Sequence, residues 1–236
     1  MTKPSPVVLI FGGSRGIGAA CCSAFENAGW QVASTYAADA PAKPVGRAYK
    51  VDIRDAKGVA DVFERVTADF GVAPIAVVAN AGINRPPRPM ADFPLADFQE
   101  LVDVNIVGAF NVLSEAARRV PKGGSIVALT TSMTGLGIPG GGPYTATKAA
   151  VESLVRSMSK ELAGREVRVN AVAPGPVDTD LFRAGKTEEA KQRSAAMSPL
   201  NRIGRAEEIA EVVLFASSQN ASWITGQIIR PNGGMI

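Results

Sequence analysis

The sequence predicts an α/β fold in which a parallel sheet is covered by helices on both faces. Short runs rich in β-branched residues alternate with longer segments of helical periodicity along the 236 residues, which is typical of successive βαβ units. Apolar residues make up 46% and charged residues 20% of the chain, close to the composition of ordinary globular proteins. No linker or internal repeat divides the sequence. We therefore predict a single doubly wound domain over residues 1–236, with about seven strands.

The alternating segments can be assigned in order along the chain. We expect strands at 7–11, 31–35, 75–79, 125–130 and 168–172, with another ahead of Asp52, and helices at 16–28, 57–70, 97–119 and 144–163. Two stretches interrupt the rhythm: a proline-rich loop at 85–94 and the segment 178–199. Because long connections in compact domains are usually functional, we expect 178–199 to form a lid over the substrate.

Composition excludes several classes of function. The chain has no histidine, so neither Ser-His-Asp hydrolysis nor the commonest zinc sites are available. The net charge of +3 includes no long basic run, which gives little support for nucleic-acid binding. Cys21 and Cys22 are adjacent in a predicted helix and should remain reduced. With no signal peptide and no apolar stretch of roughly 18 residues, we expect a cytoplasmic protein without a membrane span.

A glycine-rich loop follows the first predicted strand and opens the first helix. It reads GGSRGIG over residues 12–18, and its spacing of Gly12, Gly16 and Gly18 differs from the G-x-G-x-x-G of longer dehydrogenases. Glycines at such a junction let the backbone approach a pyrophosphate, whose charge the helix N-terminus favours. A purely structural turn is the alternative. The context predicts a dinucleotide site.

The second strand indicates which dinucleotide is bound. It ends Ser34-Thr35-Tyr36, without the Asp or Glu that usually accepts from a ribose 2′-hydroxyl about 20 residues past the glycines. Arg15 can instead form a charge-assisted fork with a 2′-phosphate. NADP(H) is therefore favoured over NAD(H), although Asp39 nearby weakens the argument.

Tyr144 and Lys148 are the candidate catalytic pair. They stand at i and i+4, on one face of a helix, where a neighbouring cation can stabilise a phenolate and lower the pKa of the tyrosine. Such a pair also occurs by chance on exposed helices. Ser132, twelve residues upstream, can polarise a substrate oxygen beside the tyrosine; Thr131 is a less favoured substitute.

Taken together, these motifs resemble the short-chain dehydrogenase/reductase family. The resemblance covers nearly the whole chain and follows the family's order: the 12–18 loop, Asp52-Ile53, Asn80-Ala81-Gly82, Asn105, Ser132, Tyr144 with Lys148, and residues 174–179 (PGPVDT). It implies a Rossmann-type fold and a homotetramer. It also implies that Tyr144 acts as acid or base, that Lys148 lowers its pKa and holds the nicotinamide ribose, that Ser132 orients the carbonyl, and that Asn105 holds a water of a proton relay.

The same resemblance implies a set of cofactor contacts. Phe11, Ala79 and Asn232 depart from the family pattern, replacing a usual threonine, asparagine and aspartate, and the first change removes a hydroxyl that ties the glycine loop to the Asn80 strand. The implied cofactor-binding residues are Gly12, Ser14, Arg15, Gly16, Ile17, Gly18, Tyr36, Asp52, Ile53, Asn80, Ala81, Gly82, Tyr144, Lys148, Pro174, Gly175, Val177 and Thr179.

Within the family, the segment from Pro199 to Gly234 is similar to the 3-oxoacyl-(acyl-carrier-protein) reductases of fatty-acid biosynthesis. The resemblance implies an NADPH-dependent reductase that converts a 3-oxoacyl thioester, linked to a carrier protein or to CoA, into the 3-hydroxyacyl product. Arg119 and Arg165 near the rim of the site would guide an acidic carrier protein. The alternatives are an NAD(P)-dependent alcohol or sugar dehydrogenase and, more remotely, a non-catalytic nucleotide sensor.

Overall fold

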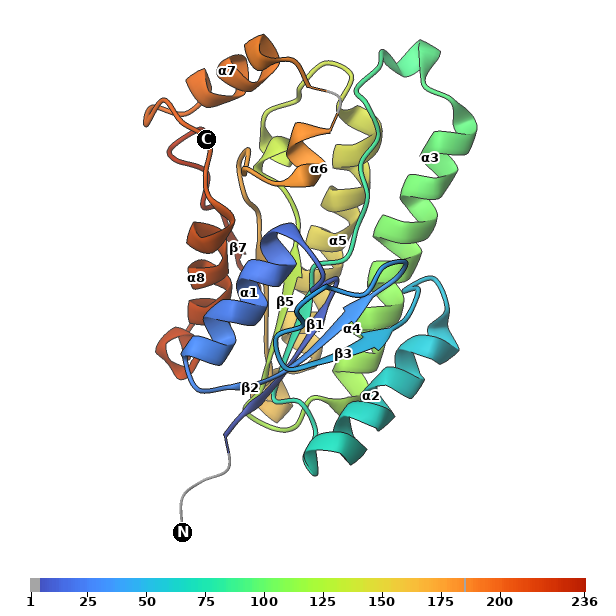
Figure 1. Ribbon diagram of the computed structural model, residues 1–236, viewed down its shortest axis with the longest axis vertical. Helices are drawn as coiled ribbons and strands as arrows, with labels where there is room; N and C mark the ends of the chain where they lie inside the picture. The colour runs from blue at the N-terminus through green and yellow to red at the C-terminus, as the bar shows by residue number, and fades with distance from the viewer. Residues whose placement is uncertain (1–4, 185) are drawn as a thin grey trace.

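A computed structural model describes residues 5–184 and 186–236 and contains one seven-stranded sheet (Figure 1). The strand order is β3-β2-β1-β4-β5-β6-β7, and all neighbouring strands run parallel. The predicted doubly wound sheet is confirmed. The strands are β1 (Val7–Phe11), β2 (Gln31–Tyr36), β3 (Arg47–Lys50), β4 (Ala76–Ala79), β5 (Ser125–Leu129), β6 (Arg168–Val172) and β7 (Ile228–Ile229).

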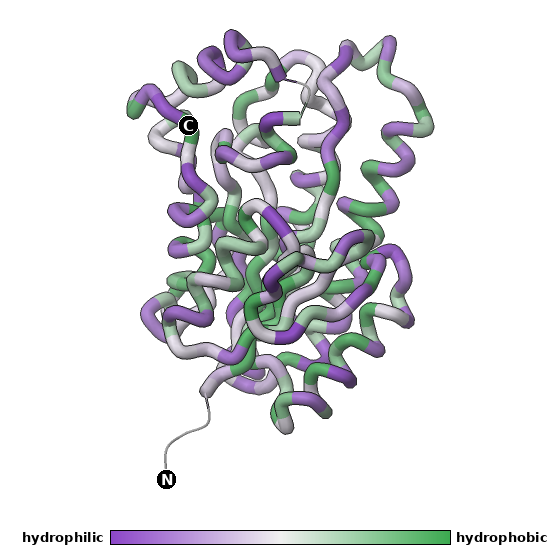
Figure 2. Tube along the Cα trace, viewed as in Figure 1, coloured by the Kyte–Doolittle hydropathy of each residue, from purple (hydrophilic) through white to green (hydrophobic). Residues whose placement is uncertain are grey.

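Helices cover both faces of this sheet. One face carries α1 (Gly16–Asn27) and α8 (Ala206–Ser217), which lie side by side. The other face carries α2 (Ala56–Phe70), α4 (Ala109–Arg119) and α5 (Gly142–Glu161). Because the two central strands β1 and β4 are buried on both sides, they are apolar throughout and not alternating. Figure 2 accordingly shows the most hydrophobic stretches of chain in the middle of the molecule.

Alternate side chains of β1 enter the two layers of the core. Leu9 and Phe11 pack toward α2 and α4, whereas Val8 and Ile10 pack toward α1 and α8. The ring of Phe11 lies 5.8 Å from that of Phe63, centroid to centroid. The strand is thereby fixed from both sides, which gives the loop that follows it a rigid base.

The helix predicted at 97–119 is divided into three parts. It consists of α3 (Leu95–Val102), a π-helical turn η2 (Asp103–Gly108) and α4. Single π turns inside α-helices occur frequently at functional sites, and this one contains Asn105. Periodicity alone does not detect the extra residue that such a turn inserts.

The predicted lid segment is not a bare loop. It contains α6 (Asp180–Arg183) and α7 (Glu188–Ala196), both at the top of Figure 1. Thr179 and Thr187 cap these helices, because their hydroxyls accept hydrogen bonds from the backbone N–H groups of Phe182 and Ala190. The short 3₁₀ turns are η1 (Met90–Asp92), η3 (Ser132–Gly135), η4 (Ala163–Arg165) and η5 (Gln219–Ala221).

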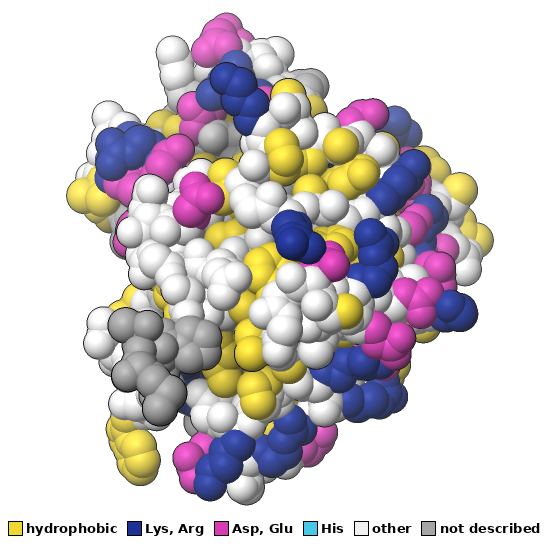
Figure 3. All heavy atoms as spheres, turned by 60° about the horizontal axis from the view of Figure 1, so that its bottom comes forward, with side chains coloured by type: hydrophobic (Ala, Val, Ile, Leu, Met, Phe, Trp, Pro, Cys, Tyr) yellow, Lys and Arg dark blue, Asp and Glu magenta, His cyan; other side chains and the backbone are white. Residues whose placement is uncertain are grey.

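Acidic and basic side chains are interspersed on the face shown in Figure 3. Within the described ranges, no helix combines the length and apolarity that a membrane crossing requires. Cys21 and Cys22 are buried free thiols, as predicted.

Candidate active site

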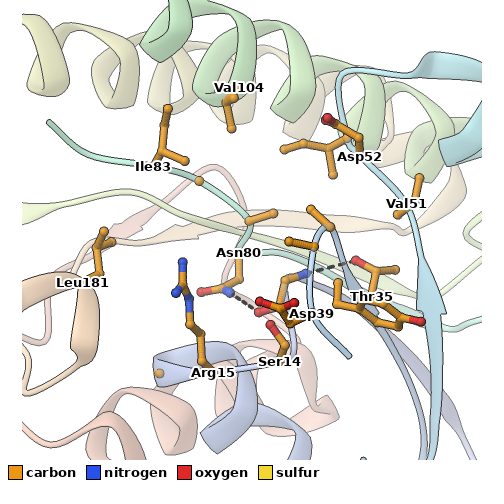
Figure 4. A pocket seen from close by; sticks show the side chains of 18 of the residues that line it. Ser14, Arg15, Thr35, Asp39, Val51, Asp52, Asn80, Ile83, Val104 and Leu181 are labelled. Carbon is orange, nitrogen blue, oxygen red and sulfur yellow. Dashed lines mark hydrogen bonds between the residues drawn. The ribbon is translucent and has the colours of Figure 1, made fainter. Parts of the chain in front are cut away.

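A cleft of about 570 Å³ opens where the carboxyl ends of β1, β2 and β4 meet the glycine loop (Figure 4). The strand order reverses between β1 and β4, and ligands of open α/β sheets bind at such switch points. Leu181 of α6 and Val104 of η2 complete the walls. Of the predicted cofactor residues, the cleft is lined by Gly12, Ser14, Arg15, Gly16, Ile17, Tyr36, Asp52, Ile53, Asn80, Ala81, Gly82 and Thr179.

The glycine loop depends on its glycines for two reasons. Gly12 has a φ of 82° and Gly16 a φ of 54°, values that L side chains rarely adopt. Gly18 does not line the cleft, but a Cβ there would lie 1.9 Å from the carbonyl oxygen of Gly12. Gly18 therefore allows α1 to approach the loop closely.

Two side chains fasten the loop despite the substitution at Phe11. The Asn80 amide donates to the carbonyl oxygen of Gly12 at 2.8 Å, and the backbone N–H of Gly12 donates to the hydroxyl of Thr35 at 3.1 Å (dashed in Figure 4). Phe11 itself is fully buried. Thr35 thus holds the loop from β2. This contact had no specific signal in the sequence beyond a hydroxyl at the end of the second strand.

Arg15 is the cation of the cleft that has no ion-pair partner among the described residues. Its side chain points into the cleft in Figure 4, whereas Arg54 is bound to Asp52 by hydrogen bonds of 3.0 and 3.1 Å from Nε. That contact lowers the pKa of Asp52. Asp39 also lines the cleft. The guanidinium of Arg15 therefore remains available to an anionic ligand group.

Tyr144 and Lys148 lie in the first two turns of α5, and burial dominates the pKa of each. Burial raises the pKa of Tyr144 to about 12 and lowers the pKa of Lys148 to about 8. Burial is the cause of both shifts, and the lowering of the tyrosine pKa by Lys148 stays a prediction. Near pH 7 the pair is therefore a neutral phenol beside a mostly protonated amine.

The Lys148 ammonium meets the sheet directly. Its Nζ donates to the carbonyl oxygen of Leu129 at 3.0 Å. A Cβ added to Gly82 would lie 3.2 Å from the same Nζ and 3.0 Å from Asn105 Oδ1. The structure therefore brings Gly82, Asn105 and Lys148 together.

The Asn105 side chain is fully engaged by hydrogen bonds. It accepts from the N–H of Ile83 at 2.9 Å and donates to the carbonyl oxygen of Ile83 at 2.9 Å and to the hydroxyl of Thr147 at 3.1 Å. It thus joins the loop after β4 to α5. The proton relay assigned to Asn105 stays a prediction.

The geometry of Ser132 does not suit the role expected of it. Ser132 is 0% exposed; its hydroxyl donates to the carbonyl oxygen of Ala173 at 2.6 Å and accepts from the amide of Asn232 at 3.0 Å. The only proton of this hydroxyl is therefore already used. The hydroxyl of Thr131 accepts from the N–H of Met133 and donates to no group among the described residues, so its proton is free.

The remaining predicted cofactor residues lie along the segment that leaves β6. Pro174 accepts a hydrogen bond from the N–H of Ser132, and the N–H of Gly175 donates to Pro231. Val177 is buried and bridges to Gly204. None of these three residues lines the cleft. The segment connects the sheet to Thr179, which does line the cleft.

Arg119 and Arg165 were expected at the rim of the site, and this expectation is wrong for the site of the same chain. Arg119 pairs with Glu115 and Glu64, and Arg165 donates to the carbonyl oxygens of Ala117 and Val120. Both arginines therefore close the C-terminus of α4, just before β5 begins. Parallel strands begin at the edge opposite to the glycine loop, so these guanidinium groups lie away from the cleft.

Comparisons with known proteins show similarity along nearly the whole chain. Residues 12–236 match the family model described as enoyl-(acyl carrier protein) reductase. A short-chain type dehydrogenase/reductase of Picea abies is 36% identical over 98% of this chain and 92% of its own length. A 3-oxoacyl-[acyl-carrier-protein] reductase of Staphylococcus aureus is 35% identical over 100% of this chain and 98% of its own.

A solved structure gives the same answer. A Serratia marcescens short-chain dehydrogenase/reductase variant superimposes with a TM-score of 0.89 at 30% identity, over 99% of both chains. The protein therefore belongs to the short-chain dehydrogenase/reductase family and is an oxidoreductase.

Proposed function

We propose that this protein is an NADPH-dependent carbonyl reductase whose substrate is a 3-oxoacyl thioester, reduced to the 3-hydroxyacyl product. The observation that carries the proposal is the grouping of Lys148 with Asn105 and Gly82 at the edge of the cleft, with Tyr144 one turn earlier on the same helix. A tyrosine with a pKa of about 12 holds its proton throughout the neutral range, as a donor to a reduced carbonyl must. The Staphylococcus relative and an acetoacetyl-CoA reductase of Rhizobium meliloti, 35% identical, support the thioester.

The cleft suits a dinucleotide with a 2′-phosphate. The positive-φ glycines leave room for a pyrophosphate at the N-terminus of α1, and Arg15 supplies a cation in the cleft that has no ion-pair partner among the described residues. Bound NADPH would supply the hydride. An Arabidopsis thaliana relative named as an NADPH-dependent aldehyde reductase-like protein, 36% identical, supports the same preference.

Each residue of the centre has a distinct task in this proposal. Tyr144 donates its proton to the carbonyl oxygen as the hydride reaches the carbonyl carbon. Lys148 has three N–H donors, of which one binds Leu129, so the others can hold a ribose hydroxyl and return a proton to Tyr144. Because the hydroxyl of Ser132 is committed, we assign the orientation of the substrate oxygen to Thr131.

Aldehyde reduction is the second candidate, because the same Arabidopsis relative carries that name. The protein chemistry would be unchanged, since an aldehyde presents the same oxygen to Tyr144 and Thr131. Only the walls of the substrate site, which include the segment 178–199 that we propose as a lid, would differ in fit.

We also propose that the protein assembles as a homotetramer. Phe110 and Val107 are 53% and 44% exposed on the α4 side of the molecule, and Trp223 is 98% exposed near the C-terminus. Large apolar side chains in such positions favour burial between subunits. Light scattering of the purified protein tests this: a tetramer mass is expected, and a monomer mass would refute the assembly.

The loss of reduced-nicotinamide absorbance tests the activity. Acetoacetyl-CoA, a 3-oxoacyl carrier-protein substrate, simple ketones and aldehydes would each be incubated with NADPH and, separately, with NADH. We expect the highest kcat/KM with NADPH and a 3-oxoacyl thioester. Turnover confined to aldehydes would favour the second candidate, and no turnover with any combination would contradict the proposal.

A further inference from the structure

Glu152 is a buried acid that the proposed chemistry does not use. It lies on α5 one helical turn beyond Lys148 and two beyond Tyr144, so it continues their stripe along the helix. Its residue exposure is 4%. Burying a carboxylate is costly unless hydrogen bonds and opposite charges compensate. The contacts that compensate Glu152 therefore indicate what it does.

One carboxylate oxygen of Glu152 is hydrogen-bonded to two threonines, one on each side of Thr131 in the sequence. Oε1 of Glu152 accepts hydrogen bonds from the hydroxyls of Thr130 and Thr134, each at 3.2 Å. The hydroxyl of Thr134 also lies 3.0 Å from the carbonyl oxygen of Thr131, so its single proton is shared between that oxygen and the carboxylate. The backbone around Thr131 is thus tied to the catalytic helix on both sides.

The second carboxylate oxygen faces cations. Oε2 of Glu152 lies 3.6 Å from Nη2 of Arg156 and 3.7 Å from Nη2 of Arg230. Arg156 is on α5, and Arg230 follows β7. These distances are longer than hydrogen bonds, so the arginines balance the charge while the two threonines determine where the carboxylate points.

We propose that Glu152 is a positioning residue that fixes the Thr131 hydroxyl relative to Tyr144. The inference rests on the proposed function, because it requires Thr131 to meet the substrate oxygen. Tyr144, Lys148 and Glu152 share one rigid helix, and Glu152 fastens the hydroxyl-bearing segment to it. A displacement of about 1 Å in such a group lowers turnover by as much as about 100-fold.

A double-mutant cycle tests whether Glu152 acts through Thr131. Glu152→Ala is expected to lower kcat about 10- to 100-fold while leaving the Kd for NADPH, measured by fluorescence, within about twofold. In the Thr131→Ala background, Glu152→Ala should lower kcat less than about threefold, because the hydroxyl that Glu152 positions is absent. In a Thr131→Ser background, where the hydroxyl is kept, Glu152→Ala should again lower kcat about 10- to 100-fold.

Further variants separate hydrogen bonding from charge and from folding. Glu152→Gln keeps an oxygen acceptor for both threonines and should retain kcat within about threefold. The Thr130→Val and Thr134→Val double variant leaves Glu152 and its arginines in place and should reproduce the kcat loss of Glu152→Ala. Glu161→Ala, which removes an exposed acid from the same helix, is the control and should behave as wild type.

The outcomes distinguish the inference from the function on which it rests. Wild-type protein that reduces no carbonyl would refute the proposed function, and the positioning role with it. If the wild type is active but Glu152→Ala lowers kcat by the same factor in the wild-type and Thr131→Ala backgrounds, only the positioning role would be overturned. Unchanged kcat in the Thr130→Val and Thr134→Val double variant would overturn it as well, without depending on whether Glu152→Ala folds.

Discussion

The ammonium of Lys148 donates to the carbonyl oxygen of Leu129 at 3.0 Å, which joins the catalytic helix α5 to the carboxyl end of β5. This bond fixes a buried cation at the edge of the sheet where the cleft opens. Burial lowers the pKa of Lys148 to about 8, so the protein retains a charge there at the expense of solvation. Such a group should matter to activity and oppose stability.

Replacing Lys148 by Met should separate these two effects. We expect kcat to fall by about 10²- to 10⁴-fold and the Tm to rise, because a desolvated charge is removed. The folded-state pKa of about 8 lies below the ordinary 10.5, so the wild type binds fewer protons folded than unfolded in that window and gains stability as pH rises through it. The Tm difference should therefore be largest below pH 8 and shrink toward pH 10.5.

Lys160→Met is the matched control, since Lys160 is exposed on the same helix. It should change neither kcat nor the pH dependence of the Tm. A Lys148→Met protein that melts well below the wild type at pH 7 would contradict the account of a destabilising buried charge.

The pH dependence of ketone reduction should follow Lys148 more than Tyr144. Tyr144 keeps its proton until about pH 12, whereas Lys148 loses its proton as pH rises through about 8. We expect kcat for reduction to be level below pH 7.5 and to fall above about pH 8. Stopped-flow rates of hydride transfer between pH 6 and 10 provide the check, and a rate that rises steadily across this range would be inconsistent with proton donation from this pair.

Arg15→Leu should change the choice of cofactor. Without the guanidinium, the KM for NADPH is expected to rise about 10- to 100-fold while the KM for NADH changes less than about threefold, since only NADPH offers a 2′-phosphate. Arg205→Leu removes another arginine at a helix N-cap, outside the cleft, and should leave both KM values unchanged. Equal losses with the two cofactors after Arg15→Leu would count against 2′-phosphate recognition.

Ser132 and Thr131 should respond oppositely to removal of their hydroxyls. Ser132→Ala deletes a buried hydrogen-bond pair and should cost about 1–3 kcal/mol of stability with kcat within about threefold of wild type. Thr131→Ala should lower kcat at least about tenfold with little change in Tm. Denaturant-induced unfolding and steady-state rates of the two variants test this prediction. The reverse pattern would indicate that Ser132, and not Thr131, orients the substrate oxygen.

Most of the fold was predictable because the central strands are buried on both faces. The strands at Val7–Phe11 and Arg168–Val172 were predicted to the residue, the first from a continuous apolar run and the second from a run rich in β-branched residues. The π turn at Asn105 was not predicted. It inserts its extra residue without changing composition, so the 97–119 stretch is amphipathic with or without it.

The candidate site was predictable in its residues and less so in their orientation. The sequence identified the glycine loop, Tyr144 and Lys148, because their spacing is constrained by backbone geometry. It did not identify which of two adjacent hydroxyls is engaged at Ser132 and Thr131, since that depends on Ala173 and Asn232 from other parts of the chain. Glu152 was likewise missed, although an acid at the next i+4 position of the Tyr144 stripe is a recognisable signal.

Tyr144→Phe tests the central claim most directly, because it removes one oxygen atom and preserves the packing of the ring. With the best substrate from the carbonyl panel and saturating NADPH, we predict a kcat lower by about 10²- to 10⁴-fold and a Kd for NADPH within about twofold of wild type. A variant that binds NADPH normally and keeps most of its turnover would show that the proton comes from another group, and would contradict the mechanism proposed here.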